Sequence, residues 1–174
     1  EKLFGALEAG GTKMICAIVD EKGNIISESN IPTTSPKETS EKLLAFFSKY
    51  KITALGIATF GPVDLNPQSP TYGCILNTPK LEWKGFSYMD AFKSLNVPIG
   101  IDTDVNGSCI GEVYFGSSKN MKNVIYITIG TGIGVGVYVE GNLLHGMQHP
   151  EAGHILLSRR EDDKGESPCP YHKN

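Results

Sequence analysis

Apolar residues gather in short runs between turn residues at the start of the chain, which predicts strands before any helix. Three such runs fall within residues 3–31, separated by residues 10–13 and by the polar segment 20–24. Short runs bounded by Gly, Asn and Asp are typical of strands joined by tight turns. The chain is therefore expected to open with a three-stranded meander.

A helix is expected directly after the meander. Ser35 is the predicted N-cap, Pro36 lies in the first turn, and Glu38 stands three residues after the cap, as in a capping box. Four apolar or aromatic residues then recur at helical spacing: Leu43, Phe46, Phe47 and Tyr50. This spacing predicts that one face of the helix packs onto a sheet.

The middle of the chain is predicted to alternate strands and short helices. Residues 54–60 form the next strand, which is parallel to its predecessors if the helix is a crossover. A loop rich in Pro, Asn, Ser, Thr and Gly follows to about residue 83, and loops of this length are usually functional or disordered. The pattern then predicts a short helix over 86–95, a short strand over 97–101, and a helix that ends near Phe115.

Two glycine-rich turns, at residues 10–13 and 130–136, interrupt runs of strand character. Without a Cβ, an anion can approach the backbone N–H groups closely, so both turns are candidate phosphate-binding hairpins. The hydroxyls of Thr128 and Thr131 are further donors. Neither turn has the spacing of a P-loop or of a dinucleotide fingerprint. On this pattern alone, the second turn is equally an ordinary glycine-rich hairpin.

A carboxylate follows the predicted strand 97–101, at a place where ligands bind in open α/β sheets. Asp104 is therefore a candidate general base, which would accept a proton from a hydroxyl nucleophile. Thr103 or Asp104 is equally a candidate cap for the helix that follows, and the two roles are compatible.

A cysteine and two histidines late in the chain are candidate zinc ligands. Cys169 and His172 form a Cys-x-x-His pair, and His154 is a candidate third ligand. A chance pair in a loop explains the pattern equally well, and a fourth ligand is missing. His145 and His149 are candidates by residue type only.

Composition argues against two classes of partner. With 174 residues, 40% apolar and 20% charged, the chain is expected to be a soluble globular unit of one large domain or slightly more. Its net charge of −3 and its lack of a basic cluster argue against a nucleic-acid surface. No apolar run approaches the roughly 20 residues that span a bilayer. Four widely spaced cysteines favour a reducing cytoplasm.

The motifs, taken in order, resemble the ROK family of sugar kinases along essentially the entire chain. They are E-A-G-G-T-K at 8–13, F-G-P-V at 60–63, N-T-P-K-L at 77–81, D-T-D-V-N at 102–106, I-G-T-G-I-G-V-G at 129–136, H-P-E-A-G-H at 149–154 and C-P-Y-H at 169–172. Glu8 in place of the more usual Asp, and D-T-D-V-N in place of N-D-x-N, are similar to the bacterial fructokinase branch.

The resemblance implies an α/β fold of the actin-like, ribonuclease-H-like ATPase type with a mixed sheet. Residues 1–115 would form the first domain of a two-domain sugar kinase, and residues 116–174 the start of the second lobe. The implied activity is ATP-dependent phosphorylation of a hexose, with D-fructose favoured and fructose 6-phosphate as product. Mg²⁺ would accompany ATP, supported through water by Glu8, and family members are often homodimers.

The resemblance also assigns roles to single residues. Asp104 matches the catalytic base. The candidates for sugar binding are Gly61, Thr78, Thr103, Glu151 and His154. The candidates for nucleotide binding are Gly10, Gly11, Thr12, Lys13, Gly130, Thr131 and Gly132, with Thr131 foremost. Three of the family's four zinc ligands match His154, Cys169 and His172, and this zinc would be structural.

Three alternatives remain beside fructose phosphorylation. Another hexose (mannose, glucose or an N-acetylhexosamine) is compatible with the motifs, because pocket shape decides sugar choice. A sugar-sensing repressor would need a DNA-binding segment before Glu8, which lies too near the start of the chain for one. A zinc-stabilised domain with vestigial motifs is the third.

The family pattern continues beyond C-P-Y-H with a cysteine, a sugar-binding glutamate and the rest of the second domain. This chain ends at Asn174. We therefore expect the 174 residues alone to bind ATP poorly and to show little or no turnover.

Overall fold

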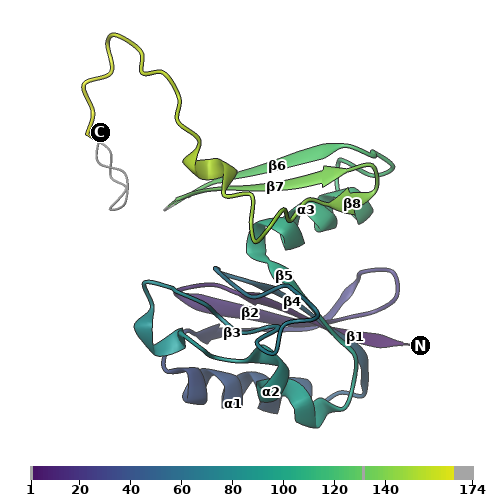
Figure 1. Ribbon diagram of the computed structural model, residues 1–174. Helices are drawn as coiled ribbons and strands as arrows, with labels where there is room; N and C mark the ends of the chain where they lie inside the picture. Colours follow the sequence, from purple (N-terminus) through teal and green to yellow (C-terminus); the bar gives the residue numbers. More distant parts are fainter. Residues whose placement is uncertain (1, 131, 167–174) are drawn as a thin grey trace.

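A five-stranded mixed sheet occupies the first part of the computed structural model, which describes residues 2–130 and 132–166 (Figure 1). Its strands are β1 (Leu3–Ala9), β2 (Lys13–Val19), β3 (Ile25–Pro32), β4 (Ile52–Thr59) and β5 (Ile99–Thr103). They lie in the order β3-β2-β1-β4-β5. The first three pair antiparallel, whereas β4 runs parallel to β1 and β5 parallel to β4. The predicted meander and mixed sheet are confirmed.

One face of this sheet is covered by α1 (Pro36–Phe47) and α2 (Tyr88–Phe92), as Figure 1 shows. The helix α1 connects β3 to β4 and buries the apolar residues that recur along it. Phe47 and Phe92 meet edge to face beneath the sheet, with ring centroids 5.9 Å apart. The predicted helix 86–95 is divided into α2 and a 3₁₀ turn, η2 (Lys93–Leu95).

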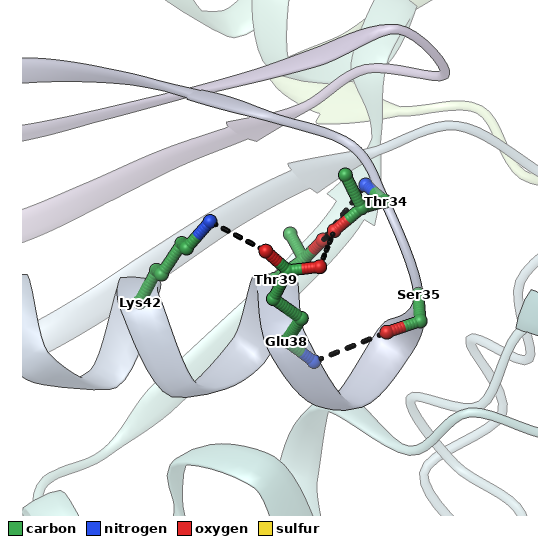
Figure 2. Close-up of polar contacts among 5 residues, drawn as sticks. All are labelled: Thr34, Ser35, Glu38, Thr39 and Lys42. Atoms are coloured by element: carbon green, nitrogen blue, oxygen red, sulfur yellow. Dashed lines mark hydrogen bonds and ion pairs between the residues drawn. The ribbon is translucent and has the colours of Figure 1, made fainter.

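The start of α1 is capped largely as predicted (Figure 2). The Ser35 hydroxyl accepts a hydrogen bond from the backbone N–H of Glu38, an interaction worth about 1 kcal/mol in typical helices. The carboxylate of Glu38 does not complete the predicted box on the cap backbone. It accepts instead from the Thr34 hydroxyl at 2.8 Å and from the Lys42 ammonium at 2.7 Å.

The long segment after β4 is ordered by its own backbone bonds. Leu76 N–H donates to Pro62 O, Gly73 N–H donates to Asp64 O, and a short 3₁₀ turn forms at η1 (Leu81–Trp83). The segment also contributes Val63, Ile75 and Trp83 to the main core. The expected loop is therefore part of the folded core, because its few apolar residues are spaced so that they reach the sheet.

A second, three-stranded antiparallel sheet follows helix α3 (Asp104–Tyr114). Its strands are β6 (Val124–Ile129), β7 (Ile133–Val139) and β8 (Asn142–Leu143). Cys109 and Val113 of α3 form a small core with Tyr138 of β7. Figure 1 shows α3 between the two sheets. A domain boundary near residue 115 stays a prediction.

The chain ends, within the described residues, in a short 3₁₀ turn, η3 (Ala152–His154), and an irregular segment to residue 166. Residues 131, 169 and 172 lie outside the described part, and so do the predictions made for them. Within the described ranges, every helix is too short or too polar to cross a bilayer.

Candidate active site

Asp104 stands where the parallel strands of the first sheet end. The register of β4 and β5 places Thr59 beside Thr103, so the turn after β4 and the start of α3 emerge side by side. Thr103 is the helix cap, because its hydroxyl accepts from the backbone N–H of Asn106 at 3.3 Å. Asp104 is the first helical residue and accepts from the N–H of Val105 at 2.9 Å. The capping role therefore belongs to Thr103.

A cavity of about 350 Å³ opens at Asp104 between the two sheets. Six of the predicted site residues line it: Gly61, Thr103, Asp104, Gly130, Gly132 and Glu151. They come from the β4 turn, the start of α3, the β6–β7 hairpin and the loop before η3. These segments are distant in sequence, so the fold brings a candidate base, candidate sugar contacts and a candidate phosphate hairpin into one site.

The environment of Asp104 favours its protonated form. Burial raises the pKa of this carboxyl, the backbone N–H of Val105 opposes the rise, and the negative charge of Glu151 adds to it. A carboxylate whose pKa lies above its usual range is a stronger proton acceptor, which is the property a general base requires.

The glycines of the second turn serve two different purposes. A Cβ on Gly134 would lie 2.5 Å from Cγ1 of Val105, and one on Gly136 would lie 2.6 Å from the Val105 carbonyl oxygen. These two glycines therefore let β7 pack closely on α3, and both lie inside β7, which begins earlier than predicted. At Gly130 and Gly132 a Cβ would meet nothing within 4 Å among the described residues, and Gly130 does not have a left-handed φ. The described fold does not itself require glycine there.

The loop before η3 carries Glu151 into the cavity. Glu151 has a left-handed φ of 48°, and Gly153 lies directly against the backbone carbonyl of Ile133. His149, earlier in the loop, accepts from the backbone N–H of Val63 through Nε2 at 3.2 Å. Since a backbone N–H can only donate, the ring is neutral and its proton is on Nδ1, which is buried without a partner among the described residues.

His149 is a cavity residue that sequence reasoning missed. Its residue type suggests only a metal ligand, although it begins the H-P-E-A-G-H motif that contains Glu151. Asn106 was also missed, and its buried Oδ1 has no partner among the described residues. Both orphaned polar atoms belong to side chains that line the cavity of Asp104. Buried polar groups without partners cost stability and suit a site that receives a polar ligand.

The remaining candidates lie around Lys80 or beyond the cavity. The turn at residues 10–13 is closed by a bond from Gly10 N–H to Lys13 O, and the Lys80 side chain packs against Gly11. The Thr78 hydroxyl is buried and accepts from the backbone N–H of Lys80. Glu8 lines a separate hollow of about 620 Å³ that also reaches Asp104.

The predicted zinc site falls mostly outside the described residues. Of its three ligands only His154 is described, and its Nδ1 lies 3.3 Å from a carboxylate oxygen of Glu151. Within residues 2–130 and 132–166, no three His, Cys, Asp or Glu side chains are grouped to hold a metal ion. His145 and His149 instead contact Asp102 and the Val63 N–H.

Comparison with known proteins identifies relatives along nearly the whole chain. A family model described as the ROK family matches residues 4–173. A putative fructokinase of Bacillus subtilis (strain 168) is 47% identical over 171 residues, which cover 98% of this chain and 57% of the relative. A fructokinase of Pediococcus pentosaceus is 43% identical over 171 residues, which cover 98% of this chain and 59% of the relative. This chain therefore spans less than two thirds of their length.

A solved structure supports the same relationship. The ROK family glucokinase from Streptomyces griseus, in complex with glucose and AMPPNP, is 27% identical to this chain and superposes with a TM-score of 0.72. The match covers 84% of this chain and 47% of that chain. This likeness confirms the predicted actin-like α/β fold with a mixed sheet.

Proposed function

Because this chain belongs to the ROK family, we propose that its protein transfers a phosphoryl group from ATP to a hexose, with fructose as the preferred acceptor. The relatives named fructokinase share 41–47% identity with this chain, whereas those named glucokinase share 28–32%. This difference supports fructose over glucose. Mannose and N-acetylhexosamines remain alternatives, because the sugar contacts do not by themselves fix the hexose.

The observation that carries the proposal is the position of Asp104. Its carboxylate lines a cavity between the two sheets, together with Glu151 and the Gly130 and Gly132 backbone. Asp104 would accept the proton of the sugar's primary hydroxyl as that oxygen attacks the γ-phosphorus of ATP. The elevated pKa of Asp104 suits this role, since the hydroxyl is a weak acid and needs a basic partner.

The other cavity residues would position the reactants. Glu151 accepts hydrogen bonds from sugar hydroxyls in this proposal. The bond from Val63 N–H holds His149 at the same cavity. The backbone N–H of Gly132 would contact the phosphate oxygens, with no Cβ to hold them away, whereas the N–H of Gly130 closes the turn by donating to the Gly132 carbonyl oxygen at 2.9 Å. Mg²⁺, when bound with ATP, supplies charge neutralisation of the phosphates.

Zinc is a further part of the proposal. His154, Cys169 and His172 form a nitrogen and sulfur donor set that suits Zn²⁺. The carboxylate of Glu151 beside the imidazole of His154 is typical of the partner that orients a metal-bound histidine. These residues would then hold the end of the loop that carries Glu151. A homodimer and a cytoplasmic location remain predictions of the resemblance.

The test is ADP release by the intact gene product with Mg-ATP and a panel of fructose, mannose, glucose and N-acetylated hexoses. We expect turnover with a strong preference for fructose. A preference for another hexose would retain the mechanism and overturn the fructose assignment. No turnover with any hexose, from a folded and zinc-loaded protein, would contradict the kinase proposal.

A further inference from the structure

The carboxylate of Asp102, two residues before Asp104, makes three hydrogen bonds. Its Oδ1 accepts from the backbone N–H of Thr103 at 2.7 Å and from the side-chain amide of Asn106 at 2.8 Å. Its Oδ2 lies 2.7 Å from Nε2 of His145. The first two bonds are local. Thr103 caps α3 and the buried Asn106 lies in its first turn, so these bonds hold the start of that helix. The third comes from the far side of the site.

His145 reaches Asp102 from the loop that follows β8, 43 residues later in the chain. A carboxylate oxygen accepts hydrogen bonds, so Nε2 of His145 carries a proton in this contact. Gly146 has a φ of 65°, which lets the chain turn directly after His145. The side chains of His145 and Asp102 are 39% and 22% exposed, so the bond is partly shielded from water. It ties the second sheet to the end of β5.

The same loop is attached a second time, to the segment that follows β4, by the bond from Val63 N–H to Nε2 of His149. Between the two attachments, Met147 is fully exposed. Glu151 follows the second attachment directly and enters the cavity of Asp104. The position of Glu151 therefore depends on two imidazoles, one bonded to Asp102 at the end of β5 and the other to Val63 in the segment after β4.

We propose that Asp102 and His145 form a positioning pair for the transfer reaction. Through Asn106, Asp102 orients the first turn of α3 that carries Asp104. Through His145, it holds the loop that presents Glu151 to the sugar. This inference rests on the proposed kinase function, and it adds two residues that touch neither substrate.

The two residues are expected to affect different kinetic constants in the intact gene product. His145→Ala releases the loop but leaves the Asp102–Asn106 bond, so the KM for the hexose rises about tenfold while kcat is nearly unchanged. Asp102→Ala removes both its bond to His145 and its bond to Asn106, so kcat falls about tenfold or more in addition to the rise in KM. The KM for ATP is the internal reference and should stay constant in the His145 variant.

Two variants separate positioning from a general loss of structure. His145→Gln keeps an N–H donor that can reach Asp102 and should restore most of the hexose KM. Lys42→Ala breaks a contact of the same 2.7 Å length on the exposed face of α1 and should leave both constants unchanged. All variants are compared well below their unfolding temperatures, so that a lower melting temperature of one variant does not affect the comparison.

An unchanged hexose KM in His145→Ala would overturn the inference. Equal losses in His145→Gln and His145→Ala would also overturn it, because the donor would then be irrelevant. If the unaltered protein phosphorylates no hexose, the proposed function fails and this inference fails with it. If the unaltered protein phosphorylates a hexose and the His145 variants have the same hexose KM, the positioning role is refuted while the proposed function stands.

Discussion

The Asp104 carboxyl is partly buried and faces the negative charge of Glu151, and both effects raise its pKa. We predict that Asp104→Asn lowers kcat/KM for the hexose by roughly 10²–10⁴-fold, because the amide cannot accept the proton of the attacking hydroxyl. Steady-state ADP release by the intact protein measures this. Turnover within a few fold of the unaltered enzyme would show that another group is the base.

The same substitution should stabilise the fold at neutral pH. The folded-state pKa of Asp104 is raised, so the stability contributed by this group is present below the unfolded-state pKa and is lost as the pH rises through the folded-state pKa. Asn at this position carries no such pH-dependent cost. The melting temperature of Asp104→Asn should exceed that of the unaltered protein at about pH 7, and the difference should shrink towards about pH 4.

Gly132 tests the phosphate hairpin, because the described fold leaves open space where its Cβ would lie. Gly132→Ala should therefore leave the melting temperature unchanged, while the added methyl group keeps phosphate oxygens away from the backbone N–H groups. We predict a KM for ATP that is about tenfold higher, with the hexose KM as the internal control. A lower melting temperature with an unchanged KM for ATP would show that this glycine is needed only for folding.

At the scale of elements, the contact between α3 and β7 fixes where Asp104 stands. A Cβ on Gly136 would lie 2.6 Å from the carbonyl oxygen of Val105 and 3.0 Å from Cβ of Cys109. Gly136→Ala must therefore push α3 away from β7. We predict a loss of about 1–3 kcal/mol in the free energy of unfolding, accompanied by a lower kcat.

Gly111→Ala is the matched control for that substitution. Gly111 lies in α3, the helix that Gly136 of β7 contacts. A Cβ on Gly111 would meet no described atom within 4 Å outside the helix itself. Alanine should stabilise α3 by up to about 1 kcal/mol through its higher helix propensity. Urea unfolding of both variants makes the comparison, and equal stabilities would argue against close packing as the reason for Gly136.

The elements that the sequence predicted well are those specified by neighbouring residues. Ser35 and Pro36 mark the start of α1, and the alternation of turns and apolar runs marks the first three strands. The arrangement of the site depends on contacts between distant residues. Local patterning cannot show that His145 reaches Asp102, nor that Gly136 faces Val105, because only the packed sheets bring them together. The ordered motifs, through their resemblance to a known family, indicated which residues belong to the site. They did not indicate how those residues are arranged.

At the scale of the whole molecule, the second sheet has one face covered by α3 and one face open to water. Val124 and Tyr126 pack towards the small core, whereas the residues of β6 that alternate with them point away from it. Ile125, Ile127 and Ile129 are 67%, 58% and 80% exposed in the described chain. Adjacent exposed isoleucines on one strand make an apolar patch of the kind that drives association.

We predict that the 174-residue chain by itself binds a hydrophobic dye and self-associates through this face. Ile127→Lys places a charge at the centre of the patch and should reduce both dye fluorescence and sedimentation-detected association, since burial of the patch would then desolvate an ammonium group. Lys substitution of Ile26, which is similarly exposed on β3 at 54%, is the control and should change neither. If the two variants show the same dye fluorescence and the same association, then association does not depend on the β6 face. The exposed isoleucines of β6 would then remain in contact with water without binding another surface.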